Sequence, residues 1–296
     1  MTFDRPGTEE PNPRTVDIDR LGSLGILEKL NDEDQQLAGA VRAALPDVAR
    51  AVDLALEHWQ RGGRVVLFGA GTSGRLAMLD AAELGPTFGV PSDRYLARMA
   101  GGAQAFQKAV EGAEDDCQAG ADAARDLAEM DVAFGITASG RTPWVLGALD
   151  AARARGAATV GLACVPKPSM AEHVDVLIAV DSGPEPISGS TRMKAGTAQK
   201  LVLNSFSTAL MIRLGKVFSN LMVDVQATNE KLRRRAVRLV ELAAGVDTDV
   251  AKETLEKADG EVKTAIVALR LRCSIEQARS QLSKANGALR RVIDAE

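Results

Sequence analysis

Three stretches of the sequence combine small and hydroxylated residues in a way that suits phosphate binding. Residues 65–75 and 132–141 each run from apolar residues through a small-residue turn into Ser-Gly-Arg, and residues 188–191 read Ser-Gly-Ser-Thr. Where such a turn precedes a helix, free backbone N–H groups, hydroxyl groups and the positive end of the helix dipole meet at one point. A phosphate monoester requires that combination. The sequence therefore predicts a site for a small phosphorylated ligand.

Two other interpretations of these turns stay open. Each serine on its own could simply cap a helix, although three such turns in one domain make capping alone a poorer explanation. Residues 69–74 also match the Gly-x-Gly-x-x-Gly pattern of dinucleotide sites, which expects an acidic residue at the end of the next strand, about 20 residues further on. That strand reads Tyr-Leu-Ala-Arg-Met over 95–99. The pattern thus favours a small phosphorylated ligand over a dinucleotide.

Carboxylates are the candidates for acid–base chemistry. Glu83 lies near an expected helix end after the first turn, and Glu111 and Glu114 lie near an expected helix start. General acid–base catalysis needs such groups within reach of the reacting atoms. Periodicity alone favours a simpler interpretation of each, because a single exposed glutamate is usually a solvated charge and acidic residues stabilise helix N-termini.

Histidine and cysteine offer little for catalysis or metal binding. His58 and His173 are far apart in the sequence, and Cys117, Cys164 and Cys273 show no Cys-x-x-Cys spacing. We therefore expect no His-based triad, no zinc centre and no disulfide framework. Both histidines are predicted to be structural.

The elements that must position these residues alternate between short apolar runs and helical patterns. Such alternation is typical of right-handed β-α-β crossovers and a mainly parallel sheet covered on both faces. Sheets of this class bind ligands at the C-terminal ends of their strands, where the first two turns fall. The sequence predicts a doubly wound α/β domain. Its expected strands are at about 64–69, 95–99, 131–137, 157–163 and 175–180, and its expected helices at about 74–84, 112–129, 143–155 and 194–214.

Helical segments flank this domain on both sides. A helix near 21–30 and a longer helical stretch that Pro46 divides in two predict an N-terminal helical arm, 1–62. The α/β domain then occupies 63–225, and a C-terminal helical region occupies 226–296. Within that last region a first helix carries a basic stretch over 231–238, which we interpret as a solvated helix face, and shorter helical patterns fall near 248–257, 260–272 and 274–284.

Composition narrows the class of protein. The 296 residues are 46% hydrophobic and 26% charged, as in ordinary folded proteins. A formal net charge of −4 and only 3% aromatic residues argue against partners such as nucleic acid or a membrane surface. The acidic, Pro-rich start lacks the apolar core of a secretory signal, and no apolar run approaches the roughly 20 residues that span a bilayer. We expect a soluble cytoplasmic protein.

Beyond these local patterns, segments spread over nearly the whole chain carry a further signal: Thr8-Glu9, Asn12-Pro13-Arg14, Gly69–Arg75, Glu83, Pro86-Thr87-Phe88-Gly89, Glu111–Asp116, Ser139–Pro143, Gly189–Thr197, Gly215-Lys216-Val217 and Asn220–Val225. In these segments the chain resembles the N-acetylmuramic acid 6-phosphate etherase family. The resemblance implies a sugar isomerase (SIS) fold and a cytoplasmic homodimer in cell-wall sugar recycling. The implied reaction cleaves the lactyl ether of the sugar phosphate and gives N-acetylglucosamine 6-phosphate and D-lactate.

The resemblance also implies roles for single residues. The family's two catalytic glutamates match Glu83 and Glu114. Leu84 stands where the family pattern has cysteine, a departure that could alter the position of Glu83. The phosphate- and sugar-binding positions match Gly71, Thr72, Ser73, Ser139, Gly140, Thr142, Ser188 and Ser190.

The implied reaction is consistent with the chemistry of two carboxyl groups. In the open-chain sugar the C2 proton lies next to the C1 aldehyde, so a carboxylate can remove it and form an enolate. A second carboxylic acid can protonate the C3 ether oxygen as lactate leaves, and water then adds to the double bond. We expect Glu114 to take the C2 proton. Glu83, its pKa raised by burial, is expected to be the acid and later the base for water. No redox cofactor and no metal are needed.

Two other functions fit the same scaffold. An aldose–ketose sugar-phosphate isomerase would share the first proton abstraction and move the proton from C2 to C1 without releasing lactate. A non-catalytic sugar-phosphate sensor, like the glucokinase regulatory protein, would use binding to control a partner, and the presence of both glutamates argues against it. We also expect a homodimer, because the N-terminal arm and the helix at 194–214 lack an obvious cover within one chain.

Overall fold

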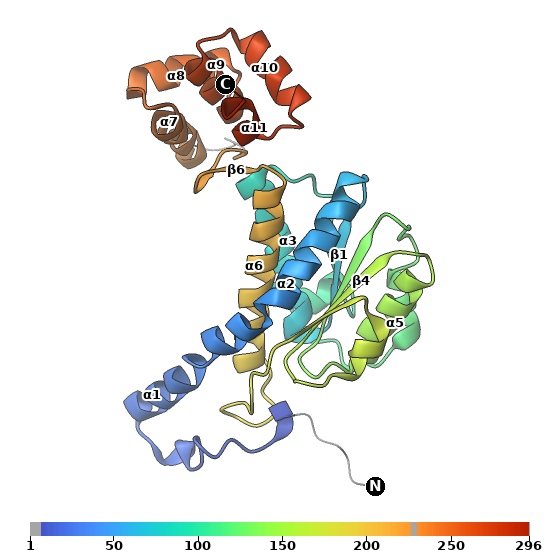
Figure 1. Cartoon of the computed structure of the whole chain (residues 1–296). Coiled ribbons are helices and arrows are strands. Elements are labelled where there is room, and N and C mark those ends of the chain that lie inside the picture. The colour runs from blue at the N-terminus through green and yellow to red at the C-terminus, as the bar shows by residue number, and fades with distance from the viewer. Residues whose placement is uncertain (1–6, 226–229, 296) are drawn as a thin grey trace. The chain divides into compact units, whose positions relative to one another are not determined.

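The computed structural model describes residues 7–225 and 230–295 (Figure 1). Position 226, where the sequence predicts the C-terminal helical region to begin, lies outside the described residues. Among the helices that the structure describes, none is both long and apolar enough to cross a membrane.

The chain folds as two compact units. The first contains Met1–Ala82 and Asp93–Ser207, and the second contains Glu83–Ser92 and Thr208–Glu296. The predicted N-terminal arm therefore belongs to the same unit as the sheet that follows it.

A five-stranded sheet forms the centre of the first unit. All of its neighbouring strands are parallel, in the order β2-β1-β3-β4-β5. The prediction of a doubly wound parallel sheet is thereby confirmed. The strands are β1 (Val65–Gly69), β2 (Tyr95–Met99), β3 (Val132–Ile136), β4 (Ala158–Ala163) and β5 (Val176–Ala179).

Helices cover both faces of this sheet. Side chains alternate between the two faces along each strand, so these buried strands present apolar side chains on both faces for helices to cover. Phe68 of β1 packs against Trp144 of α5, with ring centroids 6.0 Å apart. On the opposite face, Phe134 of β3 meets Phe206 of α6 edge to face at 4.9 Å. Figure 1 shows α5 on the side of the sheet away from α2 and α6. The helices are α1 (Ser23–Asp34), α2 (Leu37–Gln60), α4 (Cys117–Ala123) and α5 (Pro143–Arg153), together with α3 (Gly71–Phe88) and α6 (Lys194–Arg213), which both begin in this unit.

The expectation that Pro46 starts a separate helix is wrong. Pro46 lies inside the single helix α2. A proline in a helix interior costs about 3 kcal/mol through a lost hydrogen bond and a steric clash. Buried Val41, Ala44, Val48 and Ala51 continue one apolar face across it, and we attribute the unbroken helix to their burial.

The two helices that flank the predicted site differ in length from the prediction. Helix α3 begins three residues earlier than expected and runs to Phe88, with Pro86 inside it. Helix α4 is much shorter than the expected 112–129. Gly112 has a φ of +73°, a conformation that does not fit a right-handed helix. The residues before Cys117 therefore form turns, and these turns approach the site.

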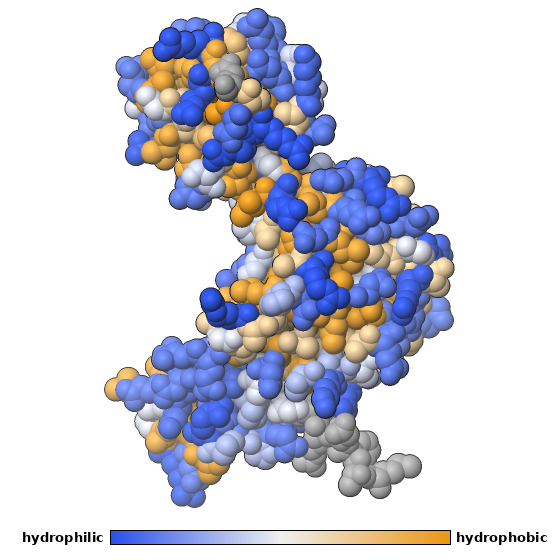
Figure 2. All heavy atoms as spheres, viewed as in Figure 1, coloured by the Kyte–Doolittle hydropathy of each residue, from blue (hydrophilic) through white to orange (hydrophobic). Residues whose placement is uncertain are grey.

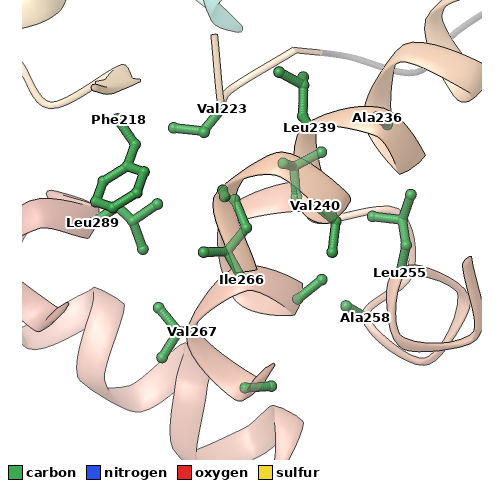
Figure 3. Packing of buried hydrophobic residues seen from close by; sticks show 14 of the residues in the cluster. Phe218, Val223, Ala236, Leu239, Val240, Leu255, Ala258, Ile266, Val267 and Leu289 are labelled. Atoms are coloured by element: carbon green, nitrogen blue, oxygen red, sulfur yellow. The ribbon is translucent and has the colours of Figure 1, made fainter. Parts of the chain in front are cut away.

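The second unit has a helical core of its own. Figure 3 shows Val240, Ile266 and Val267 packed with Phe218 and Leu289 in one buried cluster. Four of its helices agree with the predicted patterns, whereas the short hairpin and the last helix gave no usable signal in the sequence. The elements are β6 (Val217–Phe218), β7 (Leu221–Met222), α7 (Glu230–Ala244), α8 (Thr248–Lys257), α9 (Val262–Leu271), α10 (Ile275–Lys284) and α11 (Leu289–Ile293).

Candidate active site

A pocket of about 440 Å³ is lined by residues that follow β1 and β3. Strand β1 lies between β2 and β3. The chain therefore continues from β1 to β2 on one side and then crosses to β3 on the other side. Open α/β sheets bind ligands at this topological switch point, outside the C-terminal ends of the strands. We call this cavity the switch-point pocket.

The first turn brings the start of α3 into the switch-point pocket. Gly71, Thr72 and Ser73 line it. Strand and helix approach each other so closely here that a Cβ atom on Gly74 would lie 2.7 Å from the carbonyl oxygen of Gly69. Only glycine permits this approach, which explains the Gly-x-Gly-x-x-Gly match without a dinucleotide.

The second turn, between β3 and α5, adds a row of hydroxyl groups. Ser139 and Thr142 line the pocket, together with Thr137. The Oγ1 atoms of Thr137 and Thr142 are 2.7 Å apart, and Thr142 is the residue that precedes α5. The N-terminal ends of α3 and α5 therefore both reach the pocket, and their dipoles favour an anion there.

The two arginines of the repeated Ser-Gly-Arg pattern have different places. Arg75 donates to the carbonyl oxygens of Ala105 and Phe106 at 2.8 and 2.9 Å. Arg141 lines the switch-point pocket. The repeat therefore contains a signal for Arg141, which is not among the predicted binding residues.

Three predicted binding residues are not among those that line the pocket. Gly140 forms a tight turn with a φ of +72°, and its carbonyl oxygen accepts from Ser169 Oγ at 2.9 Å. In the third turn, Gly189 and Thr191 line the pocket instead of Ser188 and Ser190. Gly189 lies between the two serines in the sequence, and Thr191 follows Ser190.

Glu114 lies in the turn before α4 and lines the switch-point pocket with an exposed side chain. Its carbonyl oxygen accepts a hydrogen bond of 3.0 Å from the backbone N–H of Trp144 in the first turn of α5. Helix α4 starts after it because the Asp116 side chain accepts from the backbone N–H of Ala119 at 2.9 Å. The start of α5 thus fixes the backbone of Glu114.

Glu83 lies in the interior of α3, about three turns after Thr72. It is not among the residues that line the switch-point pocket. Its side chain is exposed, whereas Leu84 beside it is buried. The burial that we expected for Glu83 is therefore not found within one chain.

The N-terminal segment supplies a residue that the prediction missed. Glu9 lines the switch-point pocket, and a Cβ atom on Gly189 would lie 2.8 Å from Glu9 Oε2. The carbonyl oxygen of Thr8 accepts from the backbone N–H of Gly189 at 3.2 Å. Glu9 reaches the pocket through this contact with a distant part of the chain, so no local pattern could reveal it.

A buried ion pair lies next to the N-terminal segment. Lys194, the first residue of α6, has its Nζ 2.8 Å from Oε2 of Glu33 in α1, and both side chains are almost fully buried. Asn12 donates to the same oxygen at 2.8 Å, and Arg14 donates to both carboxylate oxygens. The hydrogen bonds from Arg14, followed by those from Lys194 and Asn12, lower the pKa of Glu33 to about 2.

Both histidines have structural partners elsewhere. His58 Nδ1 is 3.1 Å from the carbonyl oxygen of Met130, and His173 Nδ1 is 2.6 Å from Asp150. The three cysteines are unpaired thiols.

A second cavity, of about 480 Å³, lies within the second unit. Its lysines Lys216 and Lys263 both pair with Asp224, at 2.9 and 2.7 Å. Lys263 also donates to the carbonyl oxygen of Gly287. These pairs tie the end of the hairpin to α9. The start of α9 lines this cavity, but among the described residues that line it Thr264 is the only one with a hydroxyl group.

Comparison with known proteins identifies the family. The N-terminal SIS domain of the glucokinase regulatory protein matches residues 47–153. A phosphoheptose isomerase structure from Francisella tularensis covers 65% of this chain and 100% of its own, at 20% identity and a TM-score of 0.52, which shows a shared fold alone.

Full-length relatives are much more similar. The N-acetylmuramic acid 6-phosphate etherase of Brucella anthropi is 49% identical over 99% of this chain and 96% of its own. That of Yersinia pestis is 50% identical over 96% of this chain and 97% of its own. This chain therefore belongs to the N-acetylmuramic acid 6-phosphate etherase family.

Proposed function

We propose that this enzyme cleaves the D-lactyl ether of N-acetylmuramic acid 6-phosphate and releases N-acetylglucosamine 6-phosphate and D-lactate. The observation that carries the proposal is the switch-point pocket, in which hydroxyl groups, two helix N-termini and Glu114 line one cavity. Similarity to etherases over nearly the whole chain, at 49% and 50% identity, supports this substrate over other sugar phosphates.

In this proposal the phosphate lies at the starts of α3 and α5. Thr72, Ser73, Ser139 and Thr142 donate hydroxyl hydrogen bonds to it, and backbone N–H groups at the helix starts add to them. That these four residues line the pocket supports this role. Arg141, in the same pocket, supplies positive charge. Gly71 and Gly140 shape the turns, and Ser188 and Ser190 belong to the third turn.

The two glutamates divide the chemistry. Glu114 removes the C2 proton of the open-chain sugar, and the electron pair moves into the C1 carbonyl to form an enolate. Glu83 protonates the C3 ether oxygen as the C–O bond breaks and lactate leaves. Glu83 then takes a proton from water, which adds at C3, while C2 regains a proton. Every step uses side chains of the protein and water.

We also propose that the active enzyme is a homodimer in which Glu83 of the partner subunit completes the site. Glu83 is exposed and is not part of the pocket wall in its own chain. A second copy could both bury it and bring it to Glu114.

Apolar surface supports this dimer. Leu24 and Leu27 of α1 are 70% and 62% exposed. A cavity of about 470 Å³ is lined by Val41 and Leu45 of α2 and Leu201 of α6. Figure 2 shows orange, apolar residues among polar ones over α1 and α2. Exposed apolar surface of this kind marks sites of association.

We also propose that the enzyme acts in the cytoplasm, on sugar phosphate from cell-wall recycling.

Product analysis tests the function. The purified enzyme is incubated with N-acetylmuramic acid 6-phosphate, and D-lactate, N-acetylglucosamine 6-phosphate and ketose phosphates are quantified. Equal amounts of lactate and N-acetylglucosamine 6-phosphate are expected. A ketose phosphate without lactate would identify an isomerase, and saturable binding without any product would identify a sensor.

A further inference from the structure

Glu9 lines the switch-point pocket, and its carboxylate contacts the third turn. It ends a short 3-10 helix, Gly7–Glu9, and its Oε2 lies against Gly189, where a Cβ atom would be only 2.8 Å away. Gly189 has a φ of +74°, a conformation that favours glycine. The third turn thus leaves room for the Glu9 carboxylate at the pocket.

The backbone around Glu9 is held at several points. Along the segment that follows it, Asn12 Nδ2 donates to the carbonyl oxygen of Pro184 at 3.3 Å, and Thr15 Oγ1 donates to that of Pro186 at 2.8 Å. Thr8 contacts Gly189 as described above. The N-terminal segment therefore runs along 184–189, and the buried pair of Glu33 and Lys194 lies behind it.

Nothing in this network occupies the carboxylate of Glu9 itself. Within the described part of the chain, no ion pair or hydrogen bond involves the Glu9 side chain, whereas the carboxylate of Glu33 is bound by Asn12, Arg14 and Lys194. A carboxylate that is held in a pocket wall without a partner is an acceptor available to a ligand.

The negative charge of Glu9 determines which groups of the ligand can donate hydrogen bonds to its carboxylate. The phosphate and the lactyl carboxylate of the proposed substrate are both anions and are repelled by Glu9. The sugar hydroxyl groups and the acetamido N–H are neutral donors, and hydrogen bonds from such donors to a carboxylate are stronger than bonds between neutral groups.

We propose that Glu9 is a substrate-binding residue, whose carboxylate accepts hydrogen bonds from the hydroxyl or amide donors of the sugar and so fixes which end of the sugar phosphate faces the hydroxyl-rich turns. This inference rests on the proposed function and adds a specificity-determining residue to it. The like-charge repulsion rejects the reversed orientation, and the hydrogen bonds favour the productive one.

The test compares Glu9→Gln with Glu10→Gln, an exposed neighbour that is not among the pocket residues. We expect Glu9→Gln to raise KM for N-acetylmuramic acid 6-phosphate at least tenfold, which corresponds to about 1.4 kcal/mol. Its inhibition constant for inorganic phosphate should stay the same or fall, because a negative charge has been removed. Glu10→Gln should match the wild type in both measurements.

Two results would overturn the proposal. One is an unchanged KM in Glu9→Gln, and the other is an equal loss of affinity for the sugar phosphate and for inorganic phosphate, which would indicate a merely structural role. If the wild type released no lactate, the proposed function would fail. Calorimetric binding of N-acetylglucosamine 6-phosphate to the same three proteins would then still decide the role of Glu9.

Discussion

Glu114 and Glu83, which take separate steps in the proposed reaction, are held in different ways. The backbone of Glu114 is fixed by the start of α5, so its side chain can be changed without loss of that contact. Glu83 projects from an exposed position on α3. Substitution of either residue should therefore change chemistry much more than stability.

Proton exchange separates the two roles. In deuterated water, Glu83→Gln should still exchange the C2 proton of N-acetylmuramic acid 6-phosphate for deuterium but release lactate about a hundredfold more slowly or worse. Glu114→Gln should lose the exchange as well, because no base then forms the enolate. Nuclear magnetic resonance of the sugar phosphate measures the exchange.

Glu111→Gln is the matched control, because Glu111 is exposed in the same segment and does not line the switch-point pocket. It should behave like the wild type. Exchange that persists in Glu114→Gln and disappears in Glu83→Gln would reverse the two assignments.

Residues in local patterns were predictable, and residues that depend on distant contacts were not. The turns at Thr72, Ser73 and Ser139 follow directly from strand, turn and helix signals in short stretches of sequence. Thr191 belongs to the third of these turns, whereas Glu9 reaches the pocket because the N-terminal segment packs along 184–189. No spacing in the N-terminal segment or in 184–189 shows that the two segments meet.

Among the elements, the sheet was predictable because each strand is a short buried apolar run between turn signals. The ends of helices were less so. Pro46 suggested a break that burial of α2 overrides, and the start of α4 depends on Gly112 and on the cap formed by Asp116. The predicted domain limits of 1–62, 63–225 and 226–296 stay predictions.

The link between α1 and α6 predicts an acid-sensitive contribution to stability. Because hydrogen bonds with Arg14, Lys194 and Asn12 lower the pKa of Glu33 from 4.5 to about 2, ionised Glu33 stabilises the fold above pH 4.5. That contribution, about 3 kcal/mol from the difference in pKa, is lost as the pH falls from about 4.5 to about 2.

Denaturant unfolding of the wild type and Glu33→Gln at several pH values measures this contribution. The wild type should be more stable by about 3 kcal/mol at pH 7, and the difference should shrink through the acidic window. Glu28→Gln, on the exposed surface of the same helix, should show no such trend. An equal difference at pH 3 and pH 7 would contradict the role of the ionised pair.

At the scale of the whole molecule, the proposed homodimer with shared sites predicts that two inactive variants can restore activity in a mixed dimer. In a mixture of Glu83→Gln and Glu114→Gln proteins, a mixed dimer contains one site with both wild-type residues if Glu83 comes from the partner subunit. Subunit exchange at equal amounts should restore about a quarter of wild-type activity, since half of the dimers are mixed and each has one intact site.

Sedimentation analysis of the same samples establishes that dimers are present. Activity that stays at the level of the separate variants after exchange would place both glutamates in one chain and contradict the shared site. Full activity of a strict monomer would contradict the dimer itself.

The reaction in water labelled with heavy oxygen tests the central claim most directly. Elimination of lactate followed by hydration places the label on the C3 hydroxyl of N-acetylglucosamine 6-phosphate, and the lactate released keeps the original ether oxygen. Mass spectrometry of both products, with Glu83→Gln alongside, should show a labelled sugar phosphate, unlabelled D-lactate and almost no product from the variant. Labelled lactate, or the absence of lactate from the wild type, would contradict cleavage of the ether between C3 and its oxygen in this site.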